Sequence, residues 1–308
     1  MELSSILHID PSQLSDFKAD VFVTTLGYET RCTHISRLLG HLNCTKVALY
    51  SKSTIKDFSY EENREYYLSK KFVLKEVDSH VPDIGSILGS LNGKDLGIVI
   101  DCTSMPPNWY YQFFKWVNDN QEFQGVVRMR IVYTMANYVN MESSIKVKAI
   151  RNFLDTEIKN SVQKKKALVL GLGQEKNIGE SIYKLLKPDL HYLYYADPPV
   201  EKRFAEQTFI NNHSLINATP IKNLVSYPIR NGQAIYQSLI NTILPLRNDY
   251  SIILIAHGPK IFSVVSMLIH LGYPDVGISY PLFKKPPALD RSPSGKPVIL
   301  DILFEGEE

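Results

Sequence analysis

Four short turns contain residue types that suit the binding of a phosphate-bearing molecule. The first spans residues 27 to 31, Gly-Tyr-Glu-Thr-Arg, directly after an apolar run. Its glycine permits a tight turn, and the helix start that follows can receive an anion. Arg31 can pair with a phosphate through two hydrogen bonds, and Tyr28 can stack on a base. The alternative is an internal ion pair of Glu29 with Arg31 or Arg37, beside a partly buried tyrosine.

The second turn, residues 101 to 105 (Asp-Cys-Thr-Ser-Met), ends another apolar run. An aspartate at the carboxyl end of a central strand needs a partner, which can be a helix N-terminus, a ribose hydroxyl or a metal ion. Thr103 and Ser104 are also good helix N-caps, and Pro106 or Pro107 suits a first helical turn, so a well-capped helix is the alternative. Because no second carboxylate has a useful spacing, we expect no metal at Asp101.

The third turn, Gly171-Leu172-Gly173, is a partial match to the dinucleotide-binding fingerprint G-x-G-x-x-G. The next glycine, Gly179, comes too late to complete that fingerprint. Asp197 does stand near the position of the acidic residue that the fingerprint expects. An isolated G-x-G does not establish NAD binding.

The fourth turn spans residues 257 to 260 (His-Gly-Pro-Lys) and again follows an apolar run. Gly258 allows a close backbone approach, and Lys260 at a helix start can hold a phosphate as a point charge. His257 is a candidate acid or base, but a lone histidine at a strand end is more often structural. We therefore favour Lys260 over His257 as a ligand contact.

The elements that must position these turns follow a regular pattern. Short apolar, β-branched runs alternate with helical periodicity, which is typical of βαβ units and mostly parallel sheets. The predicted strands are 20–26, 46–51, 72–77, 97–100, 129–134, 167–170, 192–195, 251–256, 276–280 and 298–304, the last as an edge strand. The predicted helices are 33–42, 60–70, 84–91, 108–118, 143–159, 179–186, 202–211, 233–244 and 261–271.

The fold class that we predict is α/β, with two Rossmann-like domains. The 308 residues are enough for two hydrophobic cores, and the three lysines at 164–166 are interpreted as a solvated link, with a phosphate-binding patch as the alternative. The predicted domains are 1–160 and 161–308. Each opens with a strand, a glycine turn and a helix, and each has a late strand with a polar exit. A divergent duplication fits this order, as would two unrelated Rossmann-like units.

The composition indicates an ordinary soluble globular protein. Hydrophobic residues make up 44% and charged residues 21%, and the net charge of +2 gives no global electrostatic case for nucleic-acid or membrane binding. The three cysteines lack metal-ligand spacing and are expected to be reduced thiols. The N-terminus lacks the features of a secretory signal, and no apolar run approaches the ~20 residues that span a bilayer. We expect a cytoplasmic location.

The helix predicted at 108–118 is unusually aromatic. It contains Trp109, Tyr110, Tyr111, Phe113 and Phe114, more than one helix face can bury. Such an excess marks either a surface for a dimer or another partner, or a core helix covered on both sides.

The two late strands with their turns, residues 101 to 105 and 258 to 260, resemble degenerate versions of the CARF ligand-sensing domains. In that Rossmann-like superfamily, a late strand leads into a polar turn that contacts a cyclic oligonucleotide. The turn after the first strand lines the same pocket. The resemblance covers both halves of the chain, and it implies that residues 27 to 31 and 173 to 177 line ligand pockets in two tandem domains.

The sequence therefore favours a sensor or adaptor that binds a nucleotide-type or phosphate-bearing small molecule and relays this to a protein partner or a second copy. The resemblance implies a role in prokaryotic antiviral defence or signalling. Two alternatives stay open: an enzyme acting on a nucleotide or sugar phosphate through Glu29, Arg31 and Asp101, and a structural interaction partner. The sequence assigns no cofactor and no catalytic residue. The predicted ligand contacts are Gly27, Tyr28, Glu29, Arg31, Asp101, Thr103, Ser104, Gly173, Glu175, Asn177, Gly258 and Lys260.

Overall fold

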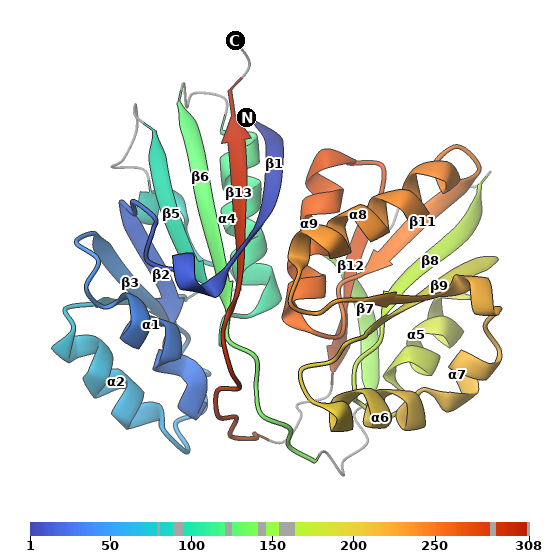
Figure 1. The fold of residues 1–308 in the computed structure, drawn as a ribbon, viewed down its shortest axis with the longest axis horizontal. Helices are drawn as coiled ribbons and strands as arrows, with labels where there is room; N and C mark the ends of the chain where they lie inside the picture. The colour runs from blue at the N-terminus through green and yellow to red at the C-terminus, as the bar shows by residue number, and fades with distance from the viewer. Residues whose placement is uncertain are drawn as a thin grey trace. The chain divides into compact units, whose positions relative to one another are not determined.

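The computed structural model describes residues 1–78, 81–88, 95–120, 125–140, 146–153, 164–283 and 288–306. The chain forms two compact units (Figure 1). Unit 1 comprises Met1–Asn137 and Ala288–Glu308, and unit 2 comprises Tyr138–Pro287. Each unit is built on one mostly parallel sheet with helices, so the predicted α/β class is confirmed.

Unit 1 contains a seven-stranded sheet in the order β1-β13-β6-β5-β2-β3-β4. The strands β6, β5, β2, β3 and β4 are parallel, whereas β13 is antiparallel to both β6 and β1. All residues of β2 and β5 are buried, because continuous apolar runs suit strands covered on both faces. The strands are β1 (Glu2–Ile9), β2 (Val21–Thr25), β3 (Thr45–Tyr50), β4 (Val73–Glu76), β5 (Leu96–Asp101), β6 (Val126–Tyr133) and β13 (Val298–Glu305).

Unit 2 contains a six-stranded sheet in the order β10-β9-β8-β11-β12-β7. Its first five strands are parallel, and β7 is antiparallel to β12. The strands are β7 (Val147–Asn152), β8 (Lys165–Gly171), β9 (Leu190–Ala196), β10 (Leu224–Tyr227), β11 (Tyr250–Ile255) and β12 (Gly277–Phe283).

The parallel parts of the two sheets have the same topology. In unit 1 the chain runs from β2 through β3 to β4 and then returns to add β5 and β6 on the other side of β2. In unit 2 it runs from β8 through β9 to β10 and then adds β11 and β12 on the other side of β8. The direction therefore reverses between β2 and β5, and between β8 and β11. Ligands of open α/β sheets bind outside the carboxyl ends of the strands at such switch points.

The chain does not divide at residue 160, where the sequence analysis placed the domain boundary. Each parallel sheet gains an antiparallel strand from the other half of the sequence: β13 joins β6 in unit 1, and β7 joins β12 in unit 2. Figure 1 shows the red strand β13 beside the blue strand β1. Since β13 lies between β1 and β6, it is not the edge strand that its sequence predicted.

The helix predicted at 143–159 is wrong over its central part, because β7 occupies Val147–Asn152. In β7 the exposed side chains of Lys148 and Arg151 interrupt partly buried ones, and pairing with β12 outweighs the helical pattern. The remainder of this predicted helix lies largely outside the described residues. Strands β1 and β10 have no counterpart in the predicted set.

The helices of the described residues follow most of the predicted segments. They are α1 (His34–Leu39), α2 (Tyr60–Ser69), α3 (Gly85–Leu88), α4 (Pro107–Asp119), α5 (Ile178–Leu186), α6 (Lys202–Asn211), α7 (His213–Asn217), α8 (Gly232–Ile243) and α9 (Lys260–Gly272). Short 3-10 turns are η1 (Pro11–Gln13), η2 (Thr30–Thr33), η4 (Ile221–Asn223) and η5 (Leu244–Leu246). Among the described residues, no helix is long and apolar enough to cross a membrane.

The aromatic helix α4 is buried on more than one side. Trp109, Tyr110, Tyr111, Phe113 and Phe114 are each at most 5% exposed within the chain. These five side chains are therefore core residues, as in the alternative of a helix covered on both sides, while Trp116 of the same helix is half-buried. In the corresponding helix α9, every residue from 261 to 270 is buried.

A partly buried ion pair links β13 to β6 in the first sheet. The guanidinium of Arg130 on β6 donates to both carboxylate oxygens of Asp301 on β13, each at 2.7 Å. Its remaining terminal nitrogen donates to the carbonyls of Gln13 and Leu14 at 2.8 and 2.9 Å. Because these donors and acceptors are matched, the buried charge is compensated, and loss of one partner would leave the other charge uncompensated.

Candidate functional site

The switch point of unit 1 lies where β2, β5 and β6 end side by side. Asp101, the last residue of β5, is buried, and its carboxylate accepts the N–H of Thr103 at 2.9 Å and the hydroxyl of Thr24 at 3.2 Å. Thr103 does not cap the following helix, because the N-cap of α4 is Pro106. The Thr103 hydroxyl instead accepts the N–H of Thr134 at 3.0 Å and so joins the ends of β5 and β6. Asp101 and Thr103 therefore shape this edge of the sheet.

Arg31 forms the internal pair that the sequence offered as an alternative to phosphate binding. Its Nε donates to Glu29 at 2.9 Å, and a terminal nitrogen donates to the carbonyl of Thr134 at 2.8 Å. Arg291 donates to the second oxygen of Glu29, also at 2.9 Å. Arg31 is only 4% exposed, and although burial alone would lower its pKa, Tyr133 and Glu29 raise it above its ordinary value. The guanidinium therefore stays charged and serves the internal pair.

A segment from the other end of the chain lies across the first turn. The carboxylate of Asp290 accepts the N–H of Thr30 at 2.7 Å and its hydroxyl at 2.6 Å. The N–H of Arg31 donates to the carbonyl of Arg291 at 3.0 Å, and Ser294 donates to the carbonyl of Met135 at 2.8 Å. We call residues 288–294 the strap. The strap supplies an anion at the start of η2, where the sequence predicted an anionic ligand.

The turn of residues 27 to 31 also receives hydrogen bonds from the side chains of Asn63 and Cys32. Asn63 on α2 donates to the carbonyls of Gly27 and Glu29, both at 3.0 Å. The thiol of Cys32 donates to the carbonyl of Thr25 at 3.0 Å and accepts the N–H of Gly27 at 3.2 Å. Burial raises the pKa of Cys32 to about 11, so this thiol is neutral and structural at physiological pH.

Gly27, Ser104 and Tyr28 are close to the same edge. A Cβ on Gly27 would lie 3.2 Å from the Cβ of Ser104, so the missing side chain lets the first and second turns approach. Tyr28 is half-buried, with its ring centroid 5.9 Å from that of Phe58, and burial raises the pKa of its hydroxyl. The structure thus brings together the seven predicted contacts of the first turn and of the turn after β5.

Two buried threonine hydroxyls at this edge lack a hydrogen-bond partner among the described residues. They belong to Thr25, at the end of β2, and Thr134, directly after β6. The strand β5, with Asp101 at its end, lies between β2 and β6. Neither threonine is among the contacts predicted from the sequence, although each is a hydroxyl residue at the end of a buried strand. The groups that surround each hydroxyl depend on the strand order, which the sequence does not give.

The switch point of unit 2 brings Glu175 to His257. A carboxylate oxygen of Glu175 lies 3.7 Å from Nε2 of His257, and that oxygen is buried without a hydrogen-bond partner in the described part of the chain. A Cβ on Gly173 would lie 2.2 Å from the Glu175 oxygen and 3.3 Å from the His257 nitrogen. Burial lowers the pKa of His257, although the nearby carboxylate of Glu175 raises it in part. His257, ranked below Lys260 from the sequence, is therefore the neutral partner of Glu175.

The other predicted contacts of unit 2 are backbone positions and helix starts. Gly258 has φ of +87°, and a Cβ there would lie 2.9 Å from the carbonyl oxygen of Leu172. Glycine is therefore required where the turn after β11 meets the turn after β8. Asn177 is the N-cap of α5 with a left-handed backbone and no side-chain cap bond, and Lys260 is the first residue of α9.

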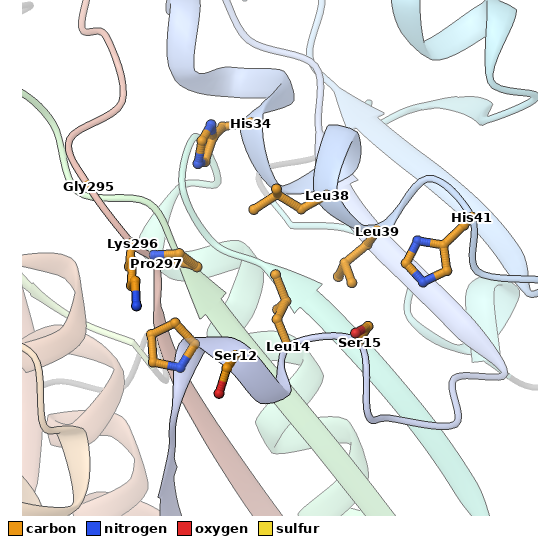
Figure 2. Close-up of a pocket in the computed structure, with 11 residues that line it drawn as sticks. Ser12, Leu14, Ser15, His34, Leu38, Leu39, His41, Gly295, Lys296 and Pro297 are labelled. Atoms are coloured by element: carbon orange, nitrogen blue, oxygen red, sulfur yellow. The ribbon is translucent and has the colours of Figure 1, made fainter.

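Two cavities of unit 1 are lined by described residues outside the set of predicted contacts. The larger, of about 420 Å³, is formed by η1, α1 and the chain before β13 (Figure 2). The smaller, of about 320 Å³, lies at the carboxyl ends of β3 and β4 and is lined by Leu26, Tyr50, Ser51, Lys52, Lys56, Tyr60, Arg64, Leu74 and Glu76. Neither cavity was predicted from the sequence.

Comparisons with known proteins do not indicate which ligand this site binds or which reaction it carries out. No protein-family model matches the chain, and no curated protein or solved structure shows a significant match to it. Within the described ranges, no three histidine, cysteine, aspartate or glutamate side chains are grouped so that they could hold a metal ion.

Proposed function

We propose that this protein is a sensor or adaptor that binds a nucleotide-type ligand at the switch point of unit 1. The observation that carries the proposal is the pair of buried, unpartnered hydroxyls of Thr25 and Thr134 on either side of Asp101. An unpaired buried hydroxyl costs about 1–3 kcal/mol, so such groups call for a partner that the described residues do not supply. Ribose hydroxyls and phosphate oxygens of a nucleotide offer both donors and acceptors.

The strap supports a sensor over an enzyme. Glu29 and Arg31, the charged residues of the first turn, are paired with each other and with strap and backbone groups. The carboxylate of Asp101 accepts hydrogen bonds from Thr24 and from the N–H of Thr103, and so holds the ends of the strands together. A ligand phosphate would compete with the carboxylate of Asp290 for Thr30, and release of the strap would relay binding to a partner. The CARF resemblance adds a cytoplasmic role in prokaryotic defence signalling to this proposal.

Thermal unfolding with added nucleotides tests the proposal. We expect AMP, ATP or a cyclic oligoadenylate to stabilise the protein by RT ln(1 + [L]/Kd), which is about 2.7 kcal/mol at one hundred times Kd. The stabilisation should shrink in Thr25→Val and Thr134→Val. It should persist in Thr45→Val, a matched change at the exposed amino end of β3.

Three outcomes separate the alternatives. If no nucleotide raises the melting temperature, the sensor proposal fails. Turnover of a bound nucleotide that is lost in Asp101→Ala and Glu29→Gln would establish the enzyme alternative instead. Loss of partner capture in a variant with an unchanged melting curve and no ligand response would favour the structural interaction partner.

A further inference from the structure

The larger cavity of unit 1 has the size and lining of a small-molecule site that is separate from the switch point. Its volume of about 420 Å³ falls in the usual range for ligand pockets, about 300–1,000 Å³. Every residue that lines it belongs to unit 1. The lining consists of Pro11, Ser12, Leu14, Ser15, His34, Leu38, Leu39, His41, Gly295, Lys296 and Pro297.

One part of the lining is apolar. Leu14 and Leu39 are buried members of the unit 1 core, and they extend that core to the cavity wall. Leu38, from the same helix as Leu39, is 44% exposed although it lines the cavity. Figure 2 shows the three leucine side chains between His34 and His41. A ligand with an apolar body would cover Leu38 and remove its surface from water.

The polar part of the lining favours an oxyanion over a cation. His34 and His41 both line the cavity, and no hydrogen bond to either imidazole is found among the described residues. Lys296 contributes a positive charge. The neighbouring carboxylate of Asp10 already accepts the N–H and the hydroxyl of Ser12, at 2.8 and 2.6 Å. The cavity lining therefore offers imidazole and ammonium donors, and none of its eleven residues is acidic.

We propose that this cavity binds a small amphipathic oxyanion. The apolar body of such a ligand lies on Leu14, Leu38 and Leu39, and its carboxylate, sulfonate or phosphate accepts hydrogen bonds from His34, His41 or Lys296. The proposal does not depend on nucleotide binding at the switch point, since it uses none of the residues placed there.

The fluorescent sulfonate 1-anilinonaphthalene-8-sulfonate is a suitable probe of the full-length protein, because it combines an aromatic body with an oxyanion. We expect one bound probe per folded chain, displaced by decanoate or decyl phosphate at concentrations at least tenfold lower than by decanol or decylamine. Comparison of decanoate with decyl phosphate identifies which oxyanion the cavity prefers. Equal displacement by decanol and decanoate would overturn the assignment of an oxyanion.

Three variants test whether the probe binds in this cavity. Leu38→Gln and the double change His34→Gln with His41→Gln should each weaken probe binding at least fivefold. Ser15→Trp should abolish it by filling the cavity from an exposed position. Leu185→Gln is the matched control, since Leu185 is a 56% exposed leucine on α5 in unit 2.

Unchanged far-ultraviolet circular dichroism and melting temperature will show that these variants fold. Probe binding that is absent from the native protein, or equally strong in Leu38→Gln and Ser15→Trp, refutes the proposal. A nucleotide response that persists in these variants would show that the switch-point site stands independently of this cavity.

Discussion

Removal of either unpartnered threonine hydroxyl is predicted to stabilise the ligand-free protein. Thr25→Val and Thr134→Val each replace a buried hydroxyl by a methyl group and keep the β-branched shape that strands favour. Because an unsatisfied buried hydroxyl costs about 1–3 kcal/mol, its removal should raise the free energy of unfolding of the ligand-free protein by up to that amount. Most core substitutions act in the opposite direction.

Thr103→Val is the matched opposite case. The hydroxyl of Thr103 is buried at the same edge, but it accepts the N–H of Thr134 at 3.0 Å. Its loss would leave that N–H without this partner, so we expect a decrease of about 1–3 kcal/mol in the free energy of unfolding. The same chemical change should therefore have opposite effects at positions that lie at the same edge of the sheet.

Urea unfolding of the three variants and the native protein measures this difference. The midpoints should rise for Thr25→Val and Thr134→Val and fall for Thr103→Val, with the slopes of the transitions unchanged. A decrease of more than about 1 kcal/mol for Thr25→Val or Thr134→Val would show that those hydroxyls have partners in the ligand-free protein. The reasoning that assigns them to a ligand would then fail.

Three further predictions concern the scaffold. Arg31→Met should lower the free energy of unfolding by about 3–5 kcal/mol in urea titrations, because the buried carboxylate of Glu29 loses a partner; a change below about 1 kcal/mol would contradict the structural role of Arg31. Gly97→Ala should cost about 1–3 kcal/mol in the same assay, because its Cβ would lie 2.1 Å from the carbonyl oxygen of Lys18, and a neutral result would refute that close approach. Burial raises the pKa of the folded Cys32 thiol to about 11, so above pH 9 the thiol ionises more readily in the unfolded chain, and the free energy of unfolding should fall by about 2–3 kcal/mol between pH 9 and 11. Cys32→Ala should lose that part of the pH dependence. If the free energy of unfolding of Cys32→Ala falls with pH as steeply as that of the native protein, Cys32 is excluded as the source.

The central strands could be predicted from sequence because they are continuous apolar runs bounded by polar turns. This is true of β2, β5, β8 and β11, all of which coincide with predicted segments. Edge and exchanged strands carry a weaker signal. In β7, Lys148 and Arg151 give a polar pattern that a helix also allows, and the pairing with β12 comes from a segment distant in sequence.

In the candidate site, too, contacts between residues close in sequence could be predicted, and contacts between distant residues could not. The pair of Glu29 and Arg31 is two residues apart, so the sequence could offer it as an alternative. Asp290 lies 260 residues from its partner Thr30, and nothing in the local sequence of either residue indicates the other. The pairing of Glu175 with His257 likewise depends on the adjacency of β8 and β11, which only the strand order provides.

The reciprocal exchange of β7 and β13 has a consequence for fragments of this chain. A fragment of residues 1–160 would contain β7 without its partner β12, and its β6 would lack β13. It would also lose the attachment of β1, which pairs with β13. An unpaired apolar edge is a template for another copy of the same chain. Either half expressed alone should therefore associate through open strand edges, whereas mixing the two halves should restore both sheets by complementation.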